Sequence, residues 1–349
     1  MVEATVLQIP FLGIGFETFL VLLIAALAGG AFGAAIGALP AFIFTGFLVI
    51  AGEAANLADA EFADAAGVLE APGITDAIAF GPVFGPHISF AAGAAATAYA
   101  ARQGYMDTGF DYHEGKNILY AFGTHRVDVL AVGAAFGVLG FLITEVSATL
   151  GLPWDPIAVA VVLSAFVHRA AFGYDLLGPA PEGRMNMRPF ARGDTRADGR
   201  LAVEPWLPHQ YEWPGVAAIG FTVGVLGAFV ALATGSPFLA FGISAASLVF
   251  LNCGVENVPV THHISLPAST AALAALVTFD GSVLIALIVG ALFGLVSALF
   301  GEAFQRAVYA HGDTHVDPPA AAIVFGTFLV ALFALAGIFD TAVWVPLPV

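Results

Sequence analysis

Long apolar stretches separated by short polar segments dominate the pattern of this chain. Stretches of about 20 apolar residues are long enough to cross a hydrocarbon layer of ~30 Å as helices. The ~10-residue alternation typical of membrane β-barrel strands does not occur. The pattern predicts an all-α polytopic protein in a lipid bilayer, with ten membrane spans at residues 11–36, 40–57, 78–103, 127–150, 156–177, 214–235, 237–254, 258–279, 282–306 and 318–340.

The composition supports this class. Of the 349 residues, 59% are hydrophobic and 10% are charged, whereas soluble domains have roughly 45–50% apolar residues. Asp and Glu number 26 against 10 Lys and Arg. An acidic chain with one lysine is typical of proteins from salt-loving microbes, where salt screens the repulsion between charges. The same balance argues against a nucleic acid as a partner.

The basic residues predict the orientation, because short cytoplasmic loops retain Lys and Arg. With ten crossings and both termini outside, all ten basic residues fall on the cytoplasmic side. Six of them lie at the end of the fifth span or in the connector at residues 178–213. The stretch from Glu53 to Asp76 contains no Lys or Arg and then falls outside. A multi-pass protein of the plasma membrane is expected.

Short matches between the two halves of the chain predict a duplication. The matching segments are 87–89 with 263–265, 133–137 with 290–294, and 155–156 with 317–318. Since five spans is an odd number, the second copy has to enter the membrane from the opposite side. We therefore expect two inverted five-helix repeats, residues 1–177 and 214–349, joined by the connector.

The third span of each repeat is expected to be broken. In both copies a Pro-containing segment, which cannot be helical, leads into His-Ile-Ser and a run of small residues. Such breaks persist in lipid only where they are buried in protein or line a wet cavity. A helix start offers N–H groups and a positive dipole end, which suit an anion or a polar neutral solute. The pore or substrate candidates are His87, Ser89, His262, His263 and Ser265, with the membrane carboxylates Glu53 and Glu256.

Two further pairs of acids occupy matching places in the halves. Glu145 and Glu302 close the fourth and ninth spans and are either gate residues or, as we favour, ordinary solvated helix ends. Asp155 and Asp317 each precede a proline. Their position predicts helix N-caps.

The segment from His311 to Asp317 alternates His and Asp. His311, Asp313 and His315 are acceptable metal ligands. Their spacing matches no strong metal signature, and a solvated loop is the favoured interpretation. No cofactor is expected.

The expected function is a channel or secondary transporter for a small polar or anionic solute, with His87 and His263 facing each other between the repeats. Imidazole titration would allow coupling to protons. The architecture resembles that of ammonium and urea transporters, but no motif of those families occurs. No Walker A, dinucleotide or zincin motif occurs either, so an enzyme is not expected. A membrane enzyme acting on a lipid or quinone, with or without a metal, and a scaffold subunit stay open as alternatives, as does a homo-oligomer.

Overall fold

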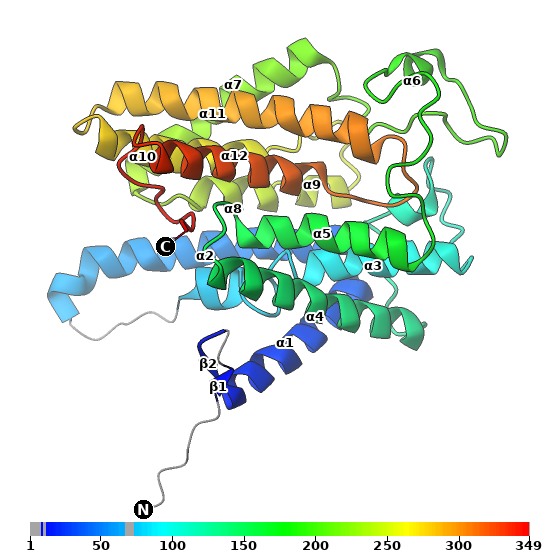
Figure 1. Cartoon of the computed structure of the whole chain (residues 1–349), viewed down its shortest axis with the longest axis horizontal. Helices are drawn as coiled ribbons and strands as arrows, with labels where there is room; N and C mark the ends of the chain where they lie inside the picture. Colours follow the sequence, from blue (N-terminus) through cyan, green and yellow to red (C-terminus); the bar gives the residue numbers. More distant parts are fainter. Residues whose placement is uncertain (1–7, 10–11, 67–72, 349) are drawn as a thin grey trace, which may run out of the picture.

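Helices form nearly all the regular structure in the computed structural model, which describes residues 8–9, 12–66 and 73–348 (Figure 1). Two short antiparallel strands, β1 (Gln8–Ile9) and β2 (Ile14–Gly15), precede the first helix. The elements of the first half are α1 (Phe16–Ile36), α2 (Ala38–Ala66), η1 (Ile74–Ala79), α3 (Ser89–Arg102), η2 (Glu114–Lys116), α4 (Val127–Thr149) and α5 (Pro156–Ala171). Those that follow are α6 (Arg188–Arg192), α7 (Trp213–Thr234), α8 (Leu239–Ala246), α9 (Val249–Asn252), α10 (His262–Thr278), α11 (Val283–Phe304), η3 (Gln305–Tyr309) and α12 (Pro318–Leu335).

Six helical stretches in the described residues are long and apolar enough to cross a membrane: α1, the Ala38–Ala58 part of α2, α4, α7, α11 with η3, and α12. Large apolar side chains cover their outer faces. Ile24, Phe229 and Leu284 are 63%, 64% and 68% exposed, an arrangement that suits contact with lipid. The fold is consistent with a helical membrane protein.

The other predicted spans are shorter helices. α3 and α10 begin at the predicted breaks, at Ser89 and His262, after irregular segments. α5 ends at Ala171, before the predicted end at residue 177. α2 continues to Ala66, well beyond residue 57, so the acidic stretch predicted to be a loop begins as helix.

Similar packing recurs in the two halves. α1 packs against α3 and α4, and α7 packs against α10 and α11. Glycines allow the close approach: a Cβ on Gly33 of α1 would overlap the Ser89 carbonyl group, and one on Gly227 of α7 would press on that of Ser265. Small residues at helix crossings are typical of membrane bundles.

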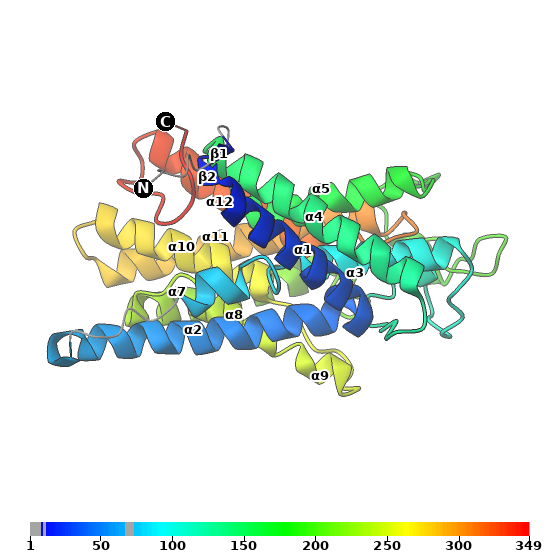
Figure 2. The same ribbon diagram turned by 90° about the horizontal axis from the view of Figure 1, so that it is seen from below.

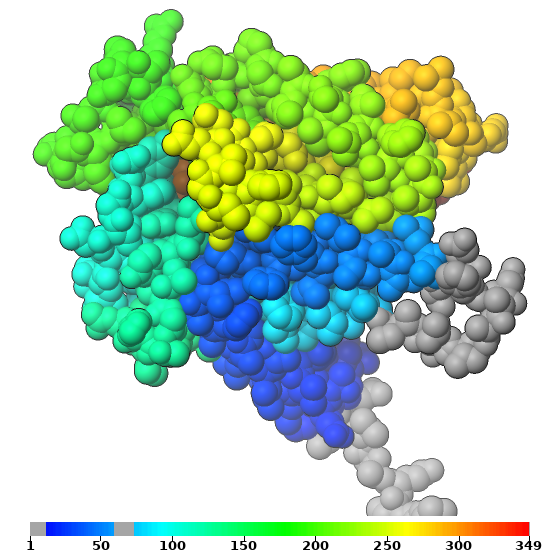
Figure 3. All heavy atoms as spheres, turned by 180° about the vertical axis from the view of Figure 1, so that it is seen from behind, coloured from blue at the N-terminus to red at the C-terminus, as the bar shows by residue number. Residues whose placement is uncertain are grey.

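The halves form two layers that meet through α2 with α8 and α5 with α12. In Figure 1 the first half, blue to green, lies below the second half, yellow-green to red. From behind, the segment around α9 lies over α2 (Figure 3).

Two ends of the bundle are distinguished below. At the connector end, residues 103–126, 172–212 and 305–317 meet, to the right in Figure 1. At the terminal end, to the left in Figure 2, residues 150–155 and 279–282 lie near residues 336–348.

Candidate functional site

A cavity of about 480 Å³, here called the central cavity, lies between the two halves. It is lined at the starts of four helices, two from each half. Phe90 belongs to the first turn of α3 and His262 begins α10, while Pro156 and Pro319 belong to the starts of α5 and α12. The positive ends of four helix dipoles therefore converge on one space.

Carboxylates cap only two of these helices. Asp155 accepts hydrogen bonds from the amides of Ile157 and Ala158 at 2.8 and 3.2 Å, and Asp317 accepts one from Ala320 at 2.8 Å. Both predicted N-caps are confirmed. Burial raises the pKa of Asp155 to about 6, although its backbone hydrogen bonds act in the opposite direction.

The starts of α3 and α10 carry no side-chain cap. Their dipoles therefore act on the central cavity without an intervening carboxylate of their own. A negative charge in the cavity would interact favourably with both helix ends.

Most of the wall is apolar, and much of it is aromatic. The aromatic lining residues are Phe42, Phe80, Phe90, Phe110, Trp206, Phe238, Phe241, Tyr309 and Trp344. Leu, Ile, Val, Ala and Pro side chains supply most of the remainder. Such a surface favours an organic ligand over a fully hydrated ion.

His262 brings an imidazole into this wall. Its ring lies 4.7 Å from the Phe42 ring and 5.8 Å from the Phe241 ring, centroid to centroid. The side chain is 5% exposed, and its Nδ1 atom has no hydrogen-bond partner within the described residues. Five other buried histidines of the described residues share this feature, so it is the place of His262 in the cavity wall that makes it a candidate ligand contact.

A second polar wall lies toward the connector end. His315 Nε2 is 2.9 Å from Asp317 Oδ1, and the His315 ring lies 5.3 Å from that of Tyr309. Lys116 Nζ lies 4.5 Å from the Tyr309 ring centroid, in cation–π geometry. These four residues line the central cavity together.

Lys116 forms a fully buried ion pair with Glu204 of the connector, at 2.7 Å. Glu204 is not part of the cavity wall and also pairs with Arg200, at 3.4 Å. Burial lowers the pKa of Lys116 to about 8, against the attraction of the Glu204 carboxylate. The pair fastens the segment between α3 and α4 to the connector.

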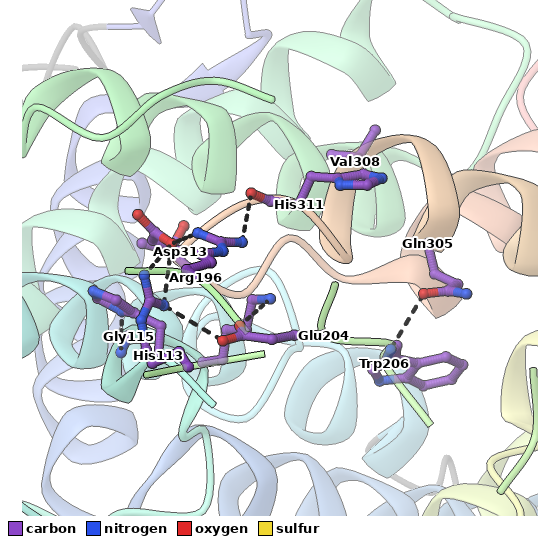
Figure 4. A network of polar contacts seen from close by, with 12 residues as sticks. His113, Gly115, Arg196, Glu204, Trp206, Gln305, Val308, His311 and Asp313 are labelled. Carbon is purple, nitrogen blue, oxygen red and sulfur yellow. Dashed lines mark hydrogen bonds and ion pairs between the residues drawn. The ribbon is translucent and has the colours of Figure 1, made fainter. Parts of the chain in front are cut away.

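The ion pair belongs to a wider network at the connector end, shown in Figure 4. Asp313 accepts hydrogen bonds from Arg196 and Arg200, at 3.2 and 3.3 Å. Burial raises the pKa of Asp313, but the charges of His113, Arg200 and Arg196 outweigh this effect and hold it below its ordinary value. Three separate segments are thus joined by charge.

Of the seven pore candidates, only His262 lines the central cavity. The His87 ring lies beside Gly85 and its carbonyl group lies close to Gly140, and the His263 ring centroid lies 5.8 Å from that of Trp206. Neither ring lines the central cavity, and the expectation that the two face each other stays a prediction.

The two serines are engaged elsewhere. The Ser89 hydroxyl donates to the Phe84 carbonyl at 3.3 Å, and the Ser265 hydroxyl donates to the His262 carbonyl at 3.2 Å. Both side chains are fully buried. They stabilise the helix starts and do not reach the cavity.

Glu53 and Glu256 occupy unlike places. Glu53 is buried at the terminal end, where it accepts hydrogen bonds from Thr75, at 2.6 Å, and Ser236. These contacts join α2 to η1 and to the segment before α8. Glu256 is exposed in the turn before α10. The two carboxylates therefore differ in burial and in partners.

The gate candidates Glu145 and Glu302 also differ from each other. Glu145 is half-buried on α4, whereas Glu302 is buried and paired with Arg306, with a further hydrogen bond from Gln305 at 3.0 Å. The solvated helix end favoured for Glu302 is therefore wrong. Neither residue lines the central cavity.

The segment containing His311, Asp313 and His315 is folded into the connector end. His311 and His315 are each 2% exposed, which corrects the expectation of a solvated loop. His311 Nε2 lies 3.0 Å from the Arg184 carbonyl oxygen. Within the described residues, no group of three or more His, Cys, Asp or Glu side chains is arranged to hold a metal ion.

Sequence reasoning missed Lys116 and Tyr309. Lys116 had one signal, because it is the single lysine among ten basic residues. The other nine basic residues are arginines. The compact ammonium group of lysine forms contacts of a different geometry from those of the planar guanidinium group. Nothing in the sequence distinguished Tyr309 from the many other aromatic residues of the chain.

The model of a family of unknown function, DUF7973, matches residues 12–348. The chain belongs to the DUF7973 family. No curated protein and no solved structure matches it. For this DUF7973 chain, the case for a function therefore depends on the geometry of the central cavity.

Proposed function

We propose that this protein is a channel or secondary transporter for a small polar or anionic solute, which crosses through the central cavity. The observation that carries the proposal is the convergence of four helix starts, two from each half, on one cavity. Transporters commonly hold substrates between two repeats, at helix starts near the middle of the membrane. Proton coupling through His262 is part of the proposal.

The proposal includes two inverted repeats with ten spans. It is supported by the recurring packing of α1 with α3 and α4 and of α7 with α10 and α11. The directions of corresponding helices also support it. α4 runs toward the terminal end, whereas α11 runs toward the connector end (Figure 1). α5 and α12 likewise run in opposite directions.

The connector end is proposed to be cytoplasmic. All ten basic residues belong to helix ends or segments at that end: Arg102, Lys116, Arg126, Arg169, Arg184, Arg188, Arg192, Arg196, Arg200 and Arg306. Cytoplasmic segments retain such residues. The acidic stretch after Glu53 would then face outward, in the plasma membrane.

Transport is tested with purified full-length protein in proteoliposomes. Chloride, nitrate, acetate, hexanoate and urea are the probes, with solid-supported membrane currents for the anions and stopped-flow light scattering for urea. We expect at least one probe to cross faster than in protein-free liposomes. His262→Phe should abolish this flux, because it keeps an aromatic ring against Phe42 and removes the imidazole.

The matched control is His125→Phe, which changes an exposed histidine between α3 and α4 and should leave flux unchanged. The proposal fails if no probe exceeds the protein-free rate. It also fails if folded His262→Phe protein transports as well as the unchanged protein.

The apolar wall also supports a second candidate, a membrane-embedded enzyme acting on a lipid or quinone, because such substrates suit an apolar cavity. Organic extraction of purified protein, followed by mass spectrometry, separates the two. A stoichiometric quinone or lipid lost in His262→Phe protein would favour the enzyme. A scaffold subunit would not use the cavity. Transport and extracted ligand that are both absent, in a protein that stays folded when side chains lining the cavity are enlarged, would favour that role.

A further inference from the structure

We infer that the half of the central cavity nearer the terminal end binds an organic ammonium ion with methyl groups on its nitrogen, its charge at the Asp155 carboxylate and its methyl groups against aromatic rings. This site goes beyond the proposed function, because recognition of the ion does not require that the ion crosses the membrane. Three features support it: the division of charge along the cavity, an open carboxylate oxygen, and a cluster of half-buried rings.

The charged groups divide the cavity into two unlike halves. All ten basic residues belong to the connector end. The uncapped helix starts also lie toward that end. Just before α10, the Val260 amide donates to Gln210 of the connector at 3.2 Å, and Phe90 in the first turn of α3 lies 5.7 Å from the His315 ring. The positive dipole ends of α3 and α10 therefore act mainly on the connector half.

Two carboxylates line the terminal half. Asp155 precedes α5, and Asp76 belongs to η1, four residues before Phe80. The third lining carboxylate, Asp317, lies at the connector half, 2.9 Å from His315. Neither Asp155 nor Asp76 has a basic partner within the described residues, since every Lys and Arg lies at the other end. The terminal half therefore attracts a cation.

Asp155 keeps one carboxylate oxygen for a ligand. The amides of Ile157 and Ala158 both donate to Oδ1. Oδ2 has no hydrogen-bond partner within the described residues and is not fully enclosed, unlike the Nδ1 atoms of the buried histidines. The residue is 6% exposed and lines the cavity, and its pKa of about 6 leaves it mainly ionised at neutral pH. A cation in the cavity would give this buried charge the partner that it lacks.

Aromatic rings supply the rest of the site. The Phe238 ring lies 5.4 Å from that of Phe80 and 5.2 Å from that of Trp344, between centroids. All three residues line the cavity and are only half-buried, and Trp344 is held by a hydrogen bond to Thr270 at 2.9 Å. The faces of such rings attract cations, and aromatic cages recognise quaternary ammonium ions.

The wall favours an organic cation over a metal ion. Hard metal ions take six or more oxygen ligands, and most of this wall is apolar. Methyl groups on nitrogen need no hydrogen-bond acceptors and gain free energy from apolar burial. The volume of about 480 Å³ lies within the range of about 300–1,000 Å³ typical of organic-ligand sites.

Binding is measured by isothermal titration calorimetry on the full chain in an uncharged maltoside detergent, so that no lipid headgroup supplies a competing ammonium group. Three probes have nearly the same shape and differ in charge: choline, neohexyl alcohol, which has carbon in place of the choline nitrogen, and the anion of tert-butylacetic acid. We expect saturable binding of choline, with a Kd at least tenfold below that of neohexyl alcohol. The anion should bind more weakly still.

Two variants test the two parts of the site. Asp155→Asn keeps a side-chain oxygen that can cap α5 and removes the charge, so choline should bind at least tenfold more weakly while neohexyl alcohol is unaffected. Phe238→Leu removes one ring and should weaken choline binding about threefold or more. Asp280→Asn is the matched control, because Asp280 is an exposed acid at the same end that does not line the cavity. It should leave the Kd of choline unchanged.

The inference is overturned if choline binds no more tightly than neohexyl alcohol, or if folded Asp155→Asn protein binds choline as tightly as the unchanged protein. It is also overturned if Asp280→Asn weakens binding as much as Asp155→Asn, since the attraction would then come from the charge of the whole surface. Unchanged affinity in Phe238→Leu would contradict the aromatic contact.

Flux measurements distinguish this inference from the proposed function. Choline binding without flux of any probe in proteoliposomes, choline included, would remove the transport proposal and leave the ammonium site intact. Flux of another probe through a protein that does not bind choline would have the opposite meaning.

Discussion

At the connector end of the central cavity, three segments far apart in the chain are joined by buried and half-buried ion pairs, with Lys116, Glu204 and Asp313 at their centre. At the terminal end, closure depends on aromatic rings in edge-to-face and tilted contact and on one carboxylate, Glu53. Phe238 lies 5.4 Å from Phe80 and 5.2 Å from Trp344.

The difference concerns what has to be broken when either end opens. Separating a buried ion pair leaves charges without partners in a medium of low dielectric constant, which is costly. Aromatic rings that slide apart lose contact area gradually. We therefore expect the terminal end to open more readily than the connector end.

The largest predicted effect is at the connector end. Lys116→Met leaves the buried Glu204 carboxylate without its 2.7 Å partner and should destabilise the protein by about 3–5 kcal/mol. Thermal unfolding in detergent, followed by circular dichroism, measures the change. Adding Glu204→Met should recover most of the loss; if the double variant is no more stable than the single one, the pair does not hold this end.

A smaller loss is expected at the terminal end. Glu53→Ala removes the acceptor for Thr75 and Ser236, both buried, and should destabilise by about 1–3 kcal/mol. Glu256→Ala, at an exposed position, is the matched control and should stay within about 0.5 kcal/mol. Equal effects of the two changes would contradict the assignment of Glu53 as the link between α2 and the start of α8.

Above pH 8, the dependence of stability on pH reports the connector end. The pKa of Lys116 falls from 10.5 in the unfolded chain to about 8 in the folded protein. Between pH 8 and about 9 the unfolded chain binds more protons at Lys116, so the free energy of unfolding should rise by about 1 kcal/mol over this interval. Nearer pH 10 the opposite effect sets in, because burial raises the pKa of Tyr112 and Tyr174 in the folded protein and the unfolded tyrosines lose their protons first. The groups facing Lys116 are Glu204 and Asp313, with Arg169 acting against them and the rings of Tyr112 and Tyr309 above it.

Unfolding midpoints at pH 7, 8, 8.5 and 9 test this rise. The paired Lys116→Met and Glu204→Met variant should lack it.

The smallest effect on stability is expected for the exposed ion pairs of Arg192 at the connector end. Arg192 contacts Glu182 and Asp194, at 2.9 and 2.6 Å, with its side chain 49% exposed. Arg192→Ala should change stability by no more than about 0.5 kcal/mol. A larger loss would mean that charge alone, and not burial, secures the connector end.

Local sequence was sufficient to predict the helix starts. Proline before each His-Ile-Ser motif cannot continue a helix, and α3 and α10 begin at those motifs. The caps at Asp155 and Asp317 were predictable for the same reason, since capping involves residues two or three positions apart.

The composition of the cavity wall was not predictable, because it depends on which side of each helix start faces inward. His262 lines the cavity while its neighbour His263 contacts Trp206; no local pattern separates adjacent residues in this way. The pairing of Lys116 with Glu204 joins positions 88 residues apart. Such a contact depends on how the connector folds across the bundle. The connector lacks the regular spacing of apolar residues that would predict its fold from sequence.

The segment after α12 has a practical consequence for experiments. It turns back over the terminal end, where Trp344 donates a hydrogen bond to Thr270 at 2.9 Å and Pro346 reaches the cavity wall. A purification tag or fluorescent protein fused to the C-terminus would pull on this segment and change the occupancy being measured. Reporters for ligand assays are better attached ahead of β1, so that the returning tail is left undisturbed.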